Sequence, residues 1–216
     1  GSRMTSISPA WLPLAEVIQI DWDDEVALEH ICSQVDVVFH AAGMNSQDST
    51  ADPIAALAFN GLATARLVSA ACWKGVQQFI YLSTAHVYAN PLVGVITEES
   101  CPRNLHPYAT SHLAGEQEVL RANQNRKIRG YILRLSNIFG TPMHVKANCW
   151  MLLVNDLCRQ AVKDRCLTLR TDGGQHRDFI PMNTVVRMLD GLVDNKINVE
   201  EGILNIGSGT SKTLLE

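Results

Sequence analysis

Short runs of apolar residues, separated by polar and glycine-containing stretches, predict buried β-strands. The runs are rich in β-branched and aromatic residues, and such near-continuous hydrophobicity is typical of parallel strands that are covered on both faces. Each run ends at a polar or small residue, where a loop is expected to begin. The expected strands are Val17–Ile20, Val35–His40, Phe79–Leu82, Tyr131–Leu135 and Leu204–Ile206.

Between these runs the apolar residues recur at helical spacing. The longest such stretch begins at Asp52 and Pro53, because Asp can cap a helix and Pro is favoured at the first helical position. Gly75 is expected to end this helix, since glycine readily adopts the conformation that closes a helix. Two further helices are predicted from about Tyr108 to Ala122 and from Cys149 to Val162.

The alternation of strands and helices predicts the fold class. It favours an α/β fold with a doubly wound parallel sheet, similar to the Rossmann fold. We expect a core over residues 5–141 and a smaller, less regular lobe over residues 142–216. The late strand at residues 203–206 is expected to return from this lobe to the sheet.

Composition and charge narrow the function classes. Hydrophobic residues make up 46% of the chain and the net charge is −4 without a basic stripe, which argues against a nucleic-acid partner. Polar residues interrupt the most apolar stretch, Ile54 to Trp73, and no secretory signal is recognisable, so we expect a cytoplasmic protein and no membrane partner. The six cysteines are scattered without a Cys-x-x-Cys pair, which predicts reduced thiols and no metal site.

Polar residues and glycines follow the expected strands at the point where each strand ends. Because ligands of open α/β sheets bind at the carboxyl ends of the strands, this edge is the expected site. The residues in question are Asp21, Gly43, Thr84, Asn137 and Gly207.

Tyr108, at the start of a predicted helix, is the strongest candidate for chemistry. A tyrosine near a strand-end hydroxyl such as Thr84 can act as a general acid or base if a cation lowers its pKa from about 10. His112 lies one turn further on the same helix face. From spacing alone, a buried tyrosine and an ordinary helix histidine remain the alternative.

Six segments then show a resemblance that covers nearly the whole chain. In this order, they resemble the motifs of the NAD(P)-dependent epimerase/dehydratase family, the extended branch of the short-chain dehydrogenases/reductases. The second segment matches only loosely and the others closely. They are Val35–Gly43, Asn60–Thr64, Phe79–Tyr88, Leu133–Gly140, Arg177–Ile180 and Asn205–Gly209.

The resemblance implies roles for single residues. It implies that Thr84, Tyr108 and His112 form the catalytic group, with Tyr108 and His112 also touching the cofactor, which is NAD or NADP. Further cofactor contacts are implied at Asp21, Trp22, Ala41, Ala42 and Gly43. Contacts to a nucleotide-sugar substrate are implied at Ser83, Asn137 and Arg177, although a turn-forming Asn137 and a surface ion pair at Arg177 remain alternatives. A homodimer is implied through the helices at residues 52–73 and 108–122.

Two of the departures from the family pattern concern the catalytic charge and the cofactor. The lysine of the family's Tyr-x-x-x-Lys motif is His112 here, which is a poor substitute for a fixed charge because free histidine is mostly neutral at pH 7. No Gly-x-x-Gly-x-x-Gly loop is found, although this loop binds the dinucleotide pyrophosphate. We therefore interpret the first βαβ unit as missing and the sequence as part of a longer protein.

Three hypotheses about the function follow from the resemblance to the family and from the departures from its pattern. The leading hypothesis is an NAD(P)-dependent epimerase or dehydratase that acts on a nucleotide-sugar by transient hydride transfer, with Tyr108 as acid and base. The first alternative is a non-catalytic member of the fold that binds a nucleotide or a protein partner, which the altered His112 favours. The second is a reductase of small carbonyl compounds.

Overall fold

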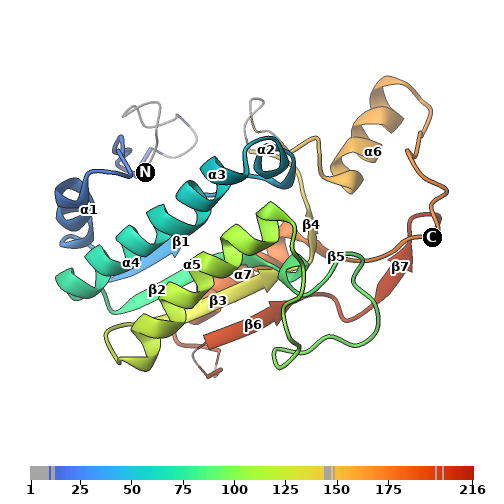
Figure 1. Cartoon of the computed structure of the whole chain (residues 1–216). Coiled ribbons are helices and arrows are strands. Elements are labelled where there is room, and N and C mark those ends of the chain that lie inside the picture. The colour runs from blue at the N-terminus through green and yellow to red at the C-terminus, as the bar shows by residue number, and fades with distance from the viewer. Residues whose placement is uncertain (1–9, 11–12, 144–146, 148, 198, 201) are drawn as a thin grey trace.

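Four parallel strands form the central sheet of the computed structural model (Figure 1). They are β1 (Val37–His40), β2 (Gln78–Thr84), β3 (Arg129–Leu135) and β6 (Gly202–Ile206), in the order β1-β2-β3-β6. The sheet confirms four of the five predicted strands, the late one included. The structure describes residues 10, 13–143, 147, 149–197, 199–200 and 202–216, so the predicted start of the core at residue 5 lies outside the described residues.

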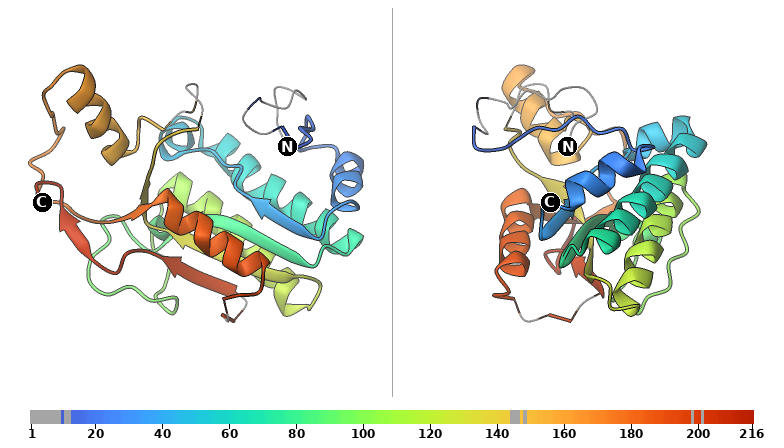
Figure 2. Two further views of the ribbon diagram at one scale, coloured as in Figure 1. Left: turned by 180° about the vertical axis from the view of Figure 1, so that it is seen from behind. Right: turned by 90° about the vertical axis from the view of Figure 1, so that its left-hand side faces the viewer.

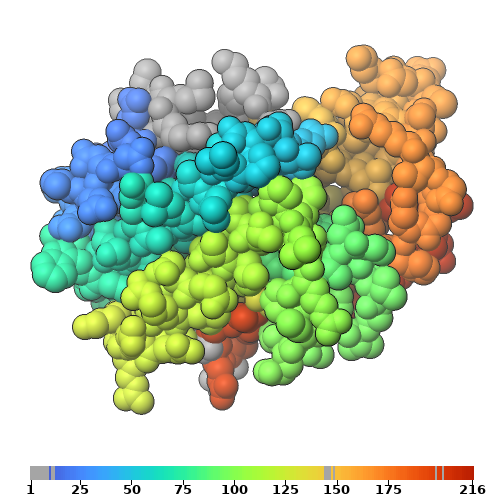
Figure 3. Space-filling model, in the orientation of Figure 1, coloured from blue at the N-terminus to red at the C-terminus, as the bar shows by residue number. Residues whose placement is uncertain are grey.

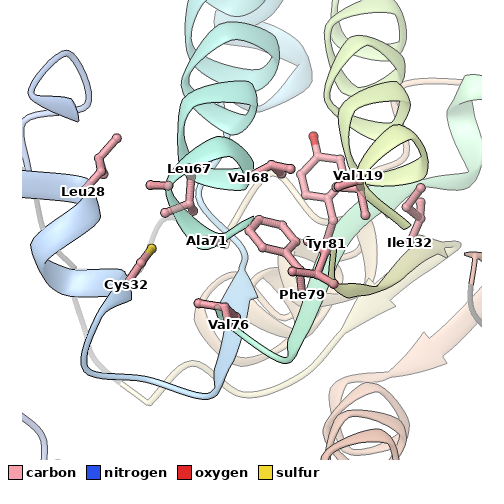
Figure 4. Close-up of a cluster of buried hydrophobic side chains, with 13 residues drawn as sticks. Leu28, Cys32, Leu67, Val68, Ala71, Val76, Phe79, Tyr81, Val119 and Ile132 are labelled. Atoms are coloured by element: carbon pink, nitrogen blue, oxygen red, sulfur yellow. The ribbon is translucent and has the colours of Figure 1, made fainter. Parts of the chain in front are cut away.

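The prediction of a strand at Val17–Ile20 is wrong. Only Gln19 forms an isolated bridge there, and within the described chain β1 is the edge of the sheet. A strand needs a neighbour that completes its backbone hydrogen bonds, and an apolar run alone does not provide one. The apolar residues of the segment still contribute to the core, because Ile20 packs against the buried cluster of Figure 4.

Helices cover the sheet on both faces (Figure 2). On one face, α4 (Ala63–Lys74) and α5 (Pro107–Gln124) pack on β2 and β3 through residues such as Val68, Val119 and Phe79. On the other face, α7 (Met182–Val193) packs its Val185 and Leu192 against a second cluster of buried residues. The central strands β2 and β3 are therefore buried on both sides, as the sequence pattern predicts, whereas Phe39 of the edge strand β1 is 49% exposed.

The predicted helix after Asp52 is present but consists of three parts. The Asp52 carboxylate caps α3 (Pro53–Ala56) by accepting from the Ala55 N–H at 2.9 Å, and Gly75 ends α4 with a positive φ of 78°. Between them lies η1 (Leu57–Leu62), a π-helical turn. Such turns commonly occur at functional sites. Two short helices before it, α1 (Glu25–Cys32) and α2 (Ser46–Ala51), were not predicted.

The same stretch, Pro53–Lys74, is long and apolar enough to cross a membrane by composition, with 22 residues and a mean hydropathy of 1.4 in its most apolar window of 18 residues. Half of its most apolar part is buried within the protein, as in the core helix of a soluble protein, so this finding is weak evidence for a span. The buried residues include polar ones, Asn60 and Thr64, which are fully enclosed.

Gly115 allows α5 to approach η1 and β2 closely. A Cβ atom at this position would lie 2.8 Å from the Asn60 carbonyl oxygen and 2.9 Å from the Tyr81 hydroxyl oxygen. Both distances are shorter than real contacts of a methyl group, so only glycine fits without movement of these groups. This close approach brings α5, η1 and β2 together beneath the candidate site.

A second, smaller sheet was not predicted. It contains β4 (Asn137–Phe139), β5 (His176–Pro181) and β7 (Ser211–Thr213), with β4 and β5 parallel and β5 and β7 antiparallel. The predicted helix at Cys149 to Val162 corresponds to α6 (Leu153–Lys163). The proposed division of the chain at residue 142 remains a prediction.

Candidate active site

Tyr108 and Thr84 lie together at the carboxyl edge of the sheet. Thr84 is the last residue of β2, and Tyr108 lies in the first turn of α5. His106 caps this helix, because its ring nitrogen Nδ1 accepts a hydrogen bond from the Tyr108 N–H at 3.2 Å. Burial raises the pKa of Tyr108, and a hydrogen bond from the Thr84 hydroxyl opposes this rise. Thr84 Oγ1 also accepts from the His86 N–H at 3.1 Å, so the Thr84 hydroxyl proton is left for the bond to Tyr108.

His112 follows Tyr108 on the buried face of α5 and is uncharged at neutral pH. Its ring packs edge-on against the Tyr108 ring at a centroid distance of 4.6 Å, and its Nδ1 lies 2.9 Å from the Tyr81 hydroxyl. Burial, together with the nearby His40, lowers the pKa of His112 to about 4. His112 therefore does not supply a positive charge that would lower the pKa of Tyr108.

Asn60 ties the loop after β1 to the helix of Tyr108. Its Oδ1 accepts from the Met44 N–H at 2.7 Å, and its Nδ2 donates to the Ser111 hydroxyl at 3.0 Å. Gly43 lies in this loop, where a Cβ atom would come within 3.3 Å of Asn60 Oδ1 and 3.6 Å of the His112 ring. Asn60 was not predicted to belong to the site, although the loosely matching motif at Asn60–Thr64 could have indicated it.

A hollow of about 730 Å³ lies between the segment at residues 19–23 and the helix from α3 to α4. Two of the predicted cofactor contacts, Asp21 and Trp22, line it together with Phe59. The Trp22 ring meets the Phe59 ring edge-on at 5.5 Å, and its buried indole N–H has no hydrogen-bond partner within the described chain. The remaining lining residues are Gln19, Ile20, Asp23, Ala55, Ala58, Leu62, Ala63 and Arg66.

Asn137, the first residue of β4, contacts Arg177, the second residue of β5. Arg177 donates to Asn137 Oδ1 at 3.3 Å, and Asn137 Nδ2 donates to the Asp178 carbonyl at 2.9 Å. Arg177 is exposed, so its guanidinium can also reach a ligand. The structure thus brings together two of the three residues predicted to contact substrate.

Ser83, the third of these residues, points elsewhere. It is buried, and its hydroxyl donates to Glu116 Oε1 at 2.5 Å. Glu116 in turn forms a buried ion pair with Arg134 at 2.5 Å. The hydroxyl proton of Ser83 is therefore used within the protein, and its contact with substrate remains a prediction.

The comparison with known families assigns the chain. A family model described as the NAD dependent epimerase/dehydratase family matches residues 2–207. The chain belongs to this family. This confirms the resemblance seen in the six motifs and the α/β fold with its parallel sheet.

Relatives of this epimerase/dehydratase chain are longer. A putative UDP-glucose 4-epimerase of Methanocaldococcus jannaschii is 27% identical over 94% of this chain and 66% of the relative. The UDP-glucuronic acid 4-epimerase of Bacillus cereus, solved with UDP-glucuronic acid and NAD, is 26% identical with a TM-score of 0.77 and covers 94% of this chain and 64% of its own. MoeE5, solved with UDP-glucose and NAD, is 27% identical with a TM-score of 0.80 over 94% and 67% of the two chains. The chain thus spans about two thirds of the length of these proteins.

NAD is the cofactor of this family, and two regions of the epimerase/dehydratase chain fit parts of it. The Trp22 indole N–H, which has no hydrogen-bond partner within the described chain, borders the hollow of about 730 Å³, and the absence of a side chain at Gly43 lets its loop approach His112 closely. The pyrophosphate has no comparable place, because no turn with two glycines joins the central sheet to a helix in the described residues.

Asp178 is a second residue of the epimerase/dehydratase motifs whose part was missed. Its carboxylate accepts hydrogen bonds from the Ser136 hydroxyl at 2.8 Å, the Ser208 N–H at 2.8 Å and the Gly209 N–H at 2.9 Å. It therefore joins the loop after β3 to the loop after β6. The exposed Arg177 lies next to this partly exposed junction.

Proposed function

We propose that this chain carries the catalytic part of an NAD-dependent epimerase or dehydratase that acts on a nucleotide-sugar. The observation that carries the proposal is the pairing of the Tyr108 and Thr84 hydroxyls at the sheet edge, next to the Gly43 loop. The comparisons support the substrate class, since similar proteins are named as UDP-glucose and UDP-glucuronic acid epimerases and one was solved with UDP-glucose.

In this proposal each residue has a distinct task. When substrate binds, Thr84 redirects its hydrogen bond from Tyr108 to the oxygen of the reacting sugar hydroxyl, and Tyr108 accepts the proton that this hydroxyl loses. NAD, when bound, supplies the acceptor for the hydride that leaves the same carbon. Arg177, assisted by Asn137, holds the charged diphosphate of the substrate, because its guanidinium suits phosphate oxygens.

Tyr108→Phe is expected to lower the turnover of UDP-glucose or UDP-glucuronic acid by about 10²-fold or more, since general acid–base catalysis typically contributes that much. The wild-type rate should rise as the pH increases above neutral, because burial raises the pKa of Tyr108 and the deprotonated form becomes more abundant. Steady-state rates across the pH range and calorimetric binding of the nucleotide-sugar measure both effects. The buried Tyr131, on β3 and outside the proposed machinery, provides the control Tyr131→Phe. Equal rates of Tyr108→Phe and the wild type would contradict the assignment.

A non-catalytic binding member is the second candidate. The observation in its favour is that His112 is uncharged and Tyr108 is held in its protonated state by burial. Tight binding of a nucleotide-sugar without any turnover, in the presence of NAD and at alkaline pH, would favour this candidate over the enzyme.

We also propose that the chain forms a homodimer through α3–α4 and α5, which lie side by side on one face (Figure 3). Ile54, Leu57 and Trp73 are exposed along the first of these helices by 83%, 55% and 76%, which is unusual for large apolar side chains. Sedimentation at high micromolar concentration is expected to give the mass of a dimer. Replacement of Ile54 and Leu57 by Glu should shift the protein to a monomer, and a wild-type monomer at that concentration would exclude the proposal.

A further inference from the structure

Tyr81 stands between two buried histidines beneath the candidate site. It lies on β2, with its ring stacked on His40 at a centroid distance of 5.4 Å and on His112 at 5.8 Å. The Tyr81 side chain is 1% exposed, and α5 packs closely against its hydroxyl, since a Cβ atom at Gly115 would lie 2.9 Å from the hydroxyl oxygen. The partners of this hydroxyl are therefore limited to the groups that surround it.

The hydrogen bonds around Tyr81 can be assigned in order. The Thr64 hydroxyl donates to the Asn60 carbonyl at 2.7 Å, so His40 Nε2, at 2.8 Å from Thr64 Oγ1, must be the donor to Thr64. The Asn60 carbonyl oxygen and Thr64 Oγ1 thus each already accept a hydrogen bond. The Tyr81 hydroxyl lies 3.5 Å from the Asn60 oxygen but only 2.9 Å from His112 Nδ1.

We propose that Tyr81 fixes His112 in the tautomer with the proton on Nε2, so that His112 serves the site as an uncharged hydrogen-bond donor. A phenol donates readily to an imidazole nitrogen, and a neutral ring that accepts at Nδ1 must carry its proton on Nε2. This nitrogen lies 3.7 Å from the position that a Gly43 Cβ would occupy, so it faces the loop after β1. The ligand class that fits such a donor is a hydroxyl oxygen, such as that of a nucleotide ribose.

The surroundings of His112 favour this neutral state from every side. The groups that face the ring are Tyr81 from β2, Tyr108 from α5 and His40 from β1, none of which is an anion at neutral pH. The nearest buried carboxylate of α5, that of Glu116, is already paired with Arg134. The tautomer does not depend on the proposed function, whereas the contact between Nε2–H and a ribose hydroxyl rests on it.

The tautomer can be read directly by NMR of the whole chain with ¹⁵N-labelled histidine. Correlations from ring protons to ring nitrogens distinguish protonated from unprotonated nitrogens, and a His112→Gln sample identifies the signals of His112. At pH 7 we expect a protonated Nε2 and an unprotonated Nδ1. Tyr81→Phe, which keeps the stacked ring, should move the Nδ1 signal toward that of a protonated nitrogen. The matched control Tyr131→Phe should leave the His112 signals unchanged.

Two results would overturn the proposal. One is a wild-type His112 that is protonated at Nδ1, and the other is a Tyr81→Phe spectrum identical to that of the wild type. Addition of NAD, with binding followed by calorimetry, tests the donor role: we expect the Nε2–H signal to shift, and an unchanged signal in a sample that binds NAD would refute that role. A sample that binds neither NAD nor a nucleotide-sugar contradicts the proposed function instead, and the spectra of the free protein still decide the tautomer.

Discussion

Acidification from pH 6.5 to about pH 4 is expected to lower the free energy of unfolding by several kcal/mol. Burial lowers the pKa values of His40 and His112 to about 4, whereas in the unfolded chain they titrate near 6.5. The unfolded state therefore binds more protons in this window, and its population rises as the pH falls. The stabilisation is fully present above pH 6.5, and its loss by pH 4 amounts to roughly 3 kcal/mol for each ring.

Urea unfolding at a series of pH values measures this dependence. His40→Gln is expected to be less stable than the wild type at pH 7, because its bond to Thr64 is altered, but to lose less stability between pH 6.5 and 4. The matched control is His30→Gln on the exposed surface of α1, which should follow the wild-type curve. A wild-type curve without a slope in this window would show that both rings accept protons in the folded state.

Glu116→Gln is expected to lower the free energy of unfolding by about 3–5 kcal/mol, the usual cost of breaking a buried ion pair by removal of one partner. The carboxylate of Glu116 is fully buried, receives two nitrogens of Arg134 at 3.0 and 2.5 Å, and accepts from Ser83. The guanidinium of Arg134 is 2% exposed and its Nη1 has no hydrogen-bond partner within the described chain, so loss of the carboxylate leaves a buried charge without compensation.

The chain offers a matched control for this variant. Glu118 lies two residues further on α5 and pairs with Arg121 at the surface, so Glu118→Gln should cost less than about 1 kcal/mol in the same denaturant titration. A double variant, Glu116→Leu with Arg134→Leu, removes both charges. Its loss of unfolding free energy should be considerably smaller than the sum of the losses in the two single Leu variants. Equal stabilities of Glu116→Gln and Glu118→Gln would contradict the proposed importance of the buried pair.

The core strands were predictable because their signal is local. A run such as Phe79–Leu82 is apolar at each position, and burial on both faces of a parallel sheet requires this pattern. The strands of the small sheet, β5 and β7, are largely exposed and polar, so no apolar run marks them. Val17–Ile20 shows the opposite error, because its apolar run satisfies the pattern while within the described chain only Gln19 forms a bridge there and no strand follows.

The residues of the candidate site likewise include some that local motifs predicted and some that no local pattern marked. Tyr108 and Thr84 were recognised from motifs whose residues lie close together in the sequence, and the structure places them side by side. Tyr81 and Glu116 were missed because their importance arises from partners on other elements, His112 and Arg134. Glu116 carries one sequence signal that could have been used. It lies eight residues after Tyr108, two helical turns along the same buried face, where a carboxylate requires a partner.

The π-helical turn at Leu57–Leu62 changes the direction in which the side chains of α4 point relative to those of α3. A π-turn holds one residue more than an α-turn, and each residue of an α-helix corresponds to a rotation of about 100°. The faces of α3 and α4 are therefore offset relative to an uninterrupted helix. This offset lets Asn60 point at the Met44 loop while Thr64, one turn later, meets His40. The extra residue in this one turn thus allows the same helix to contact the loop after β1 through Asn60 and His40 beneath the site through Thr64.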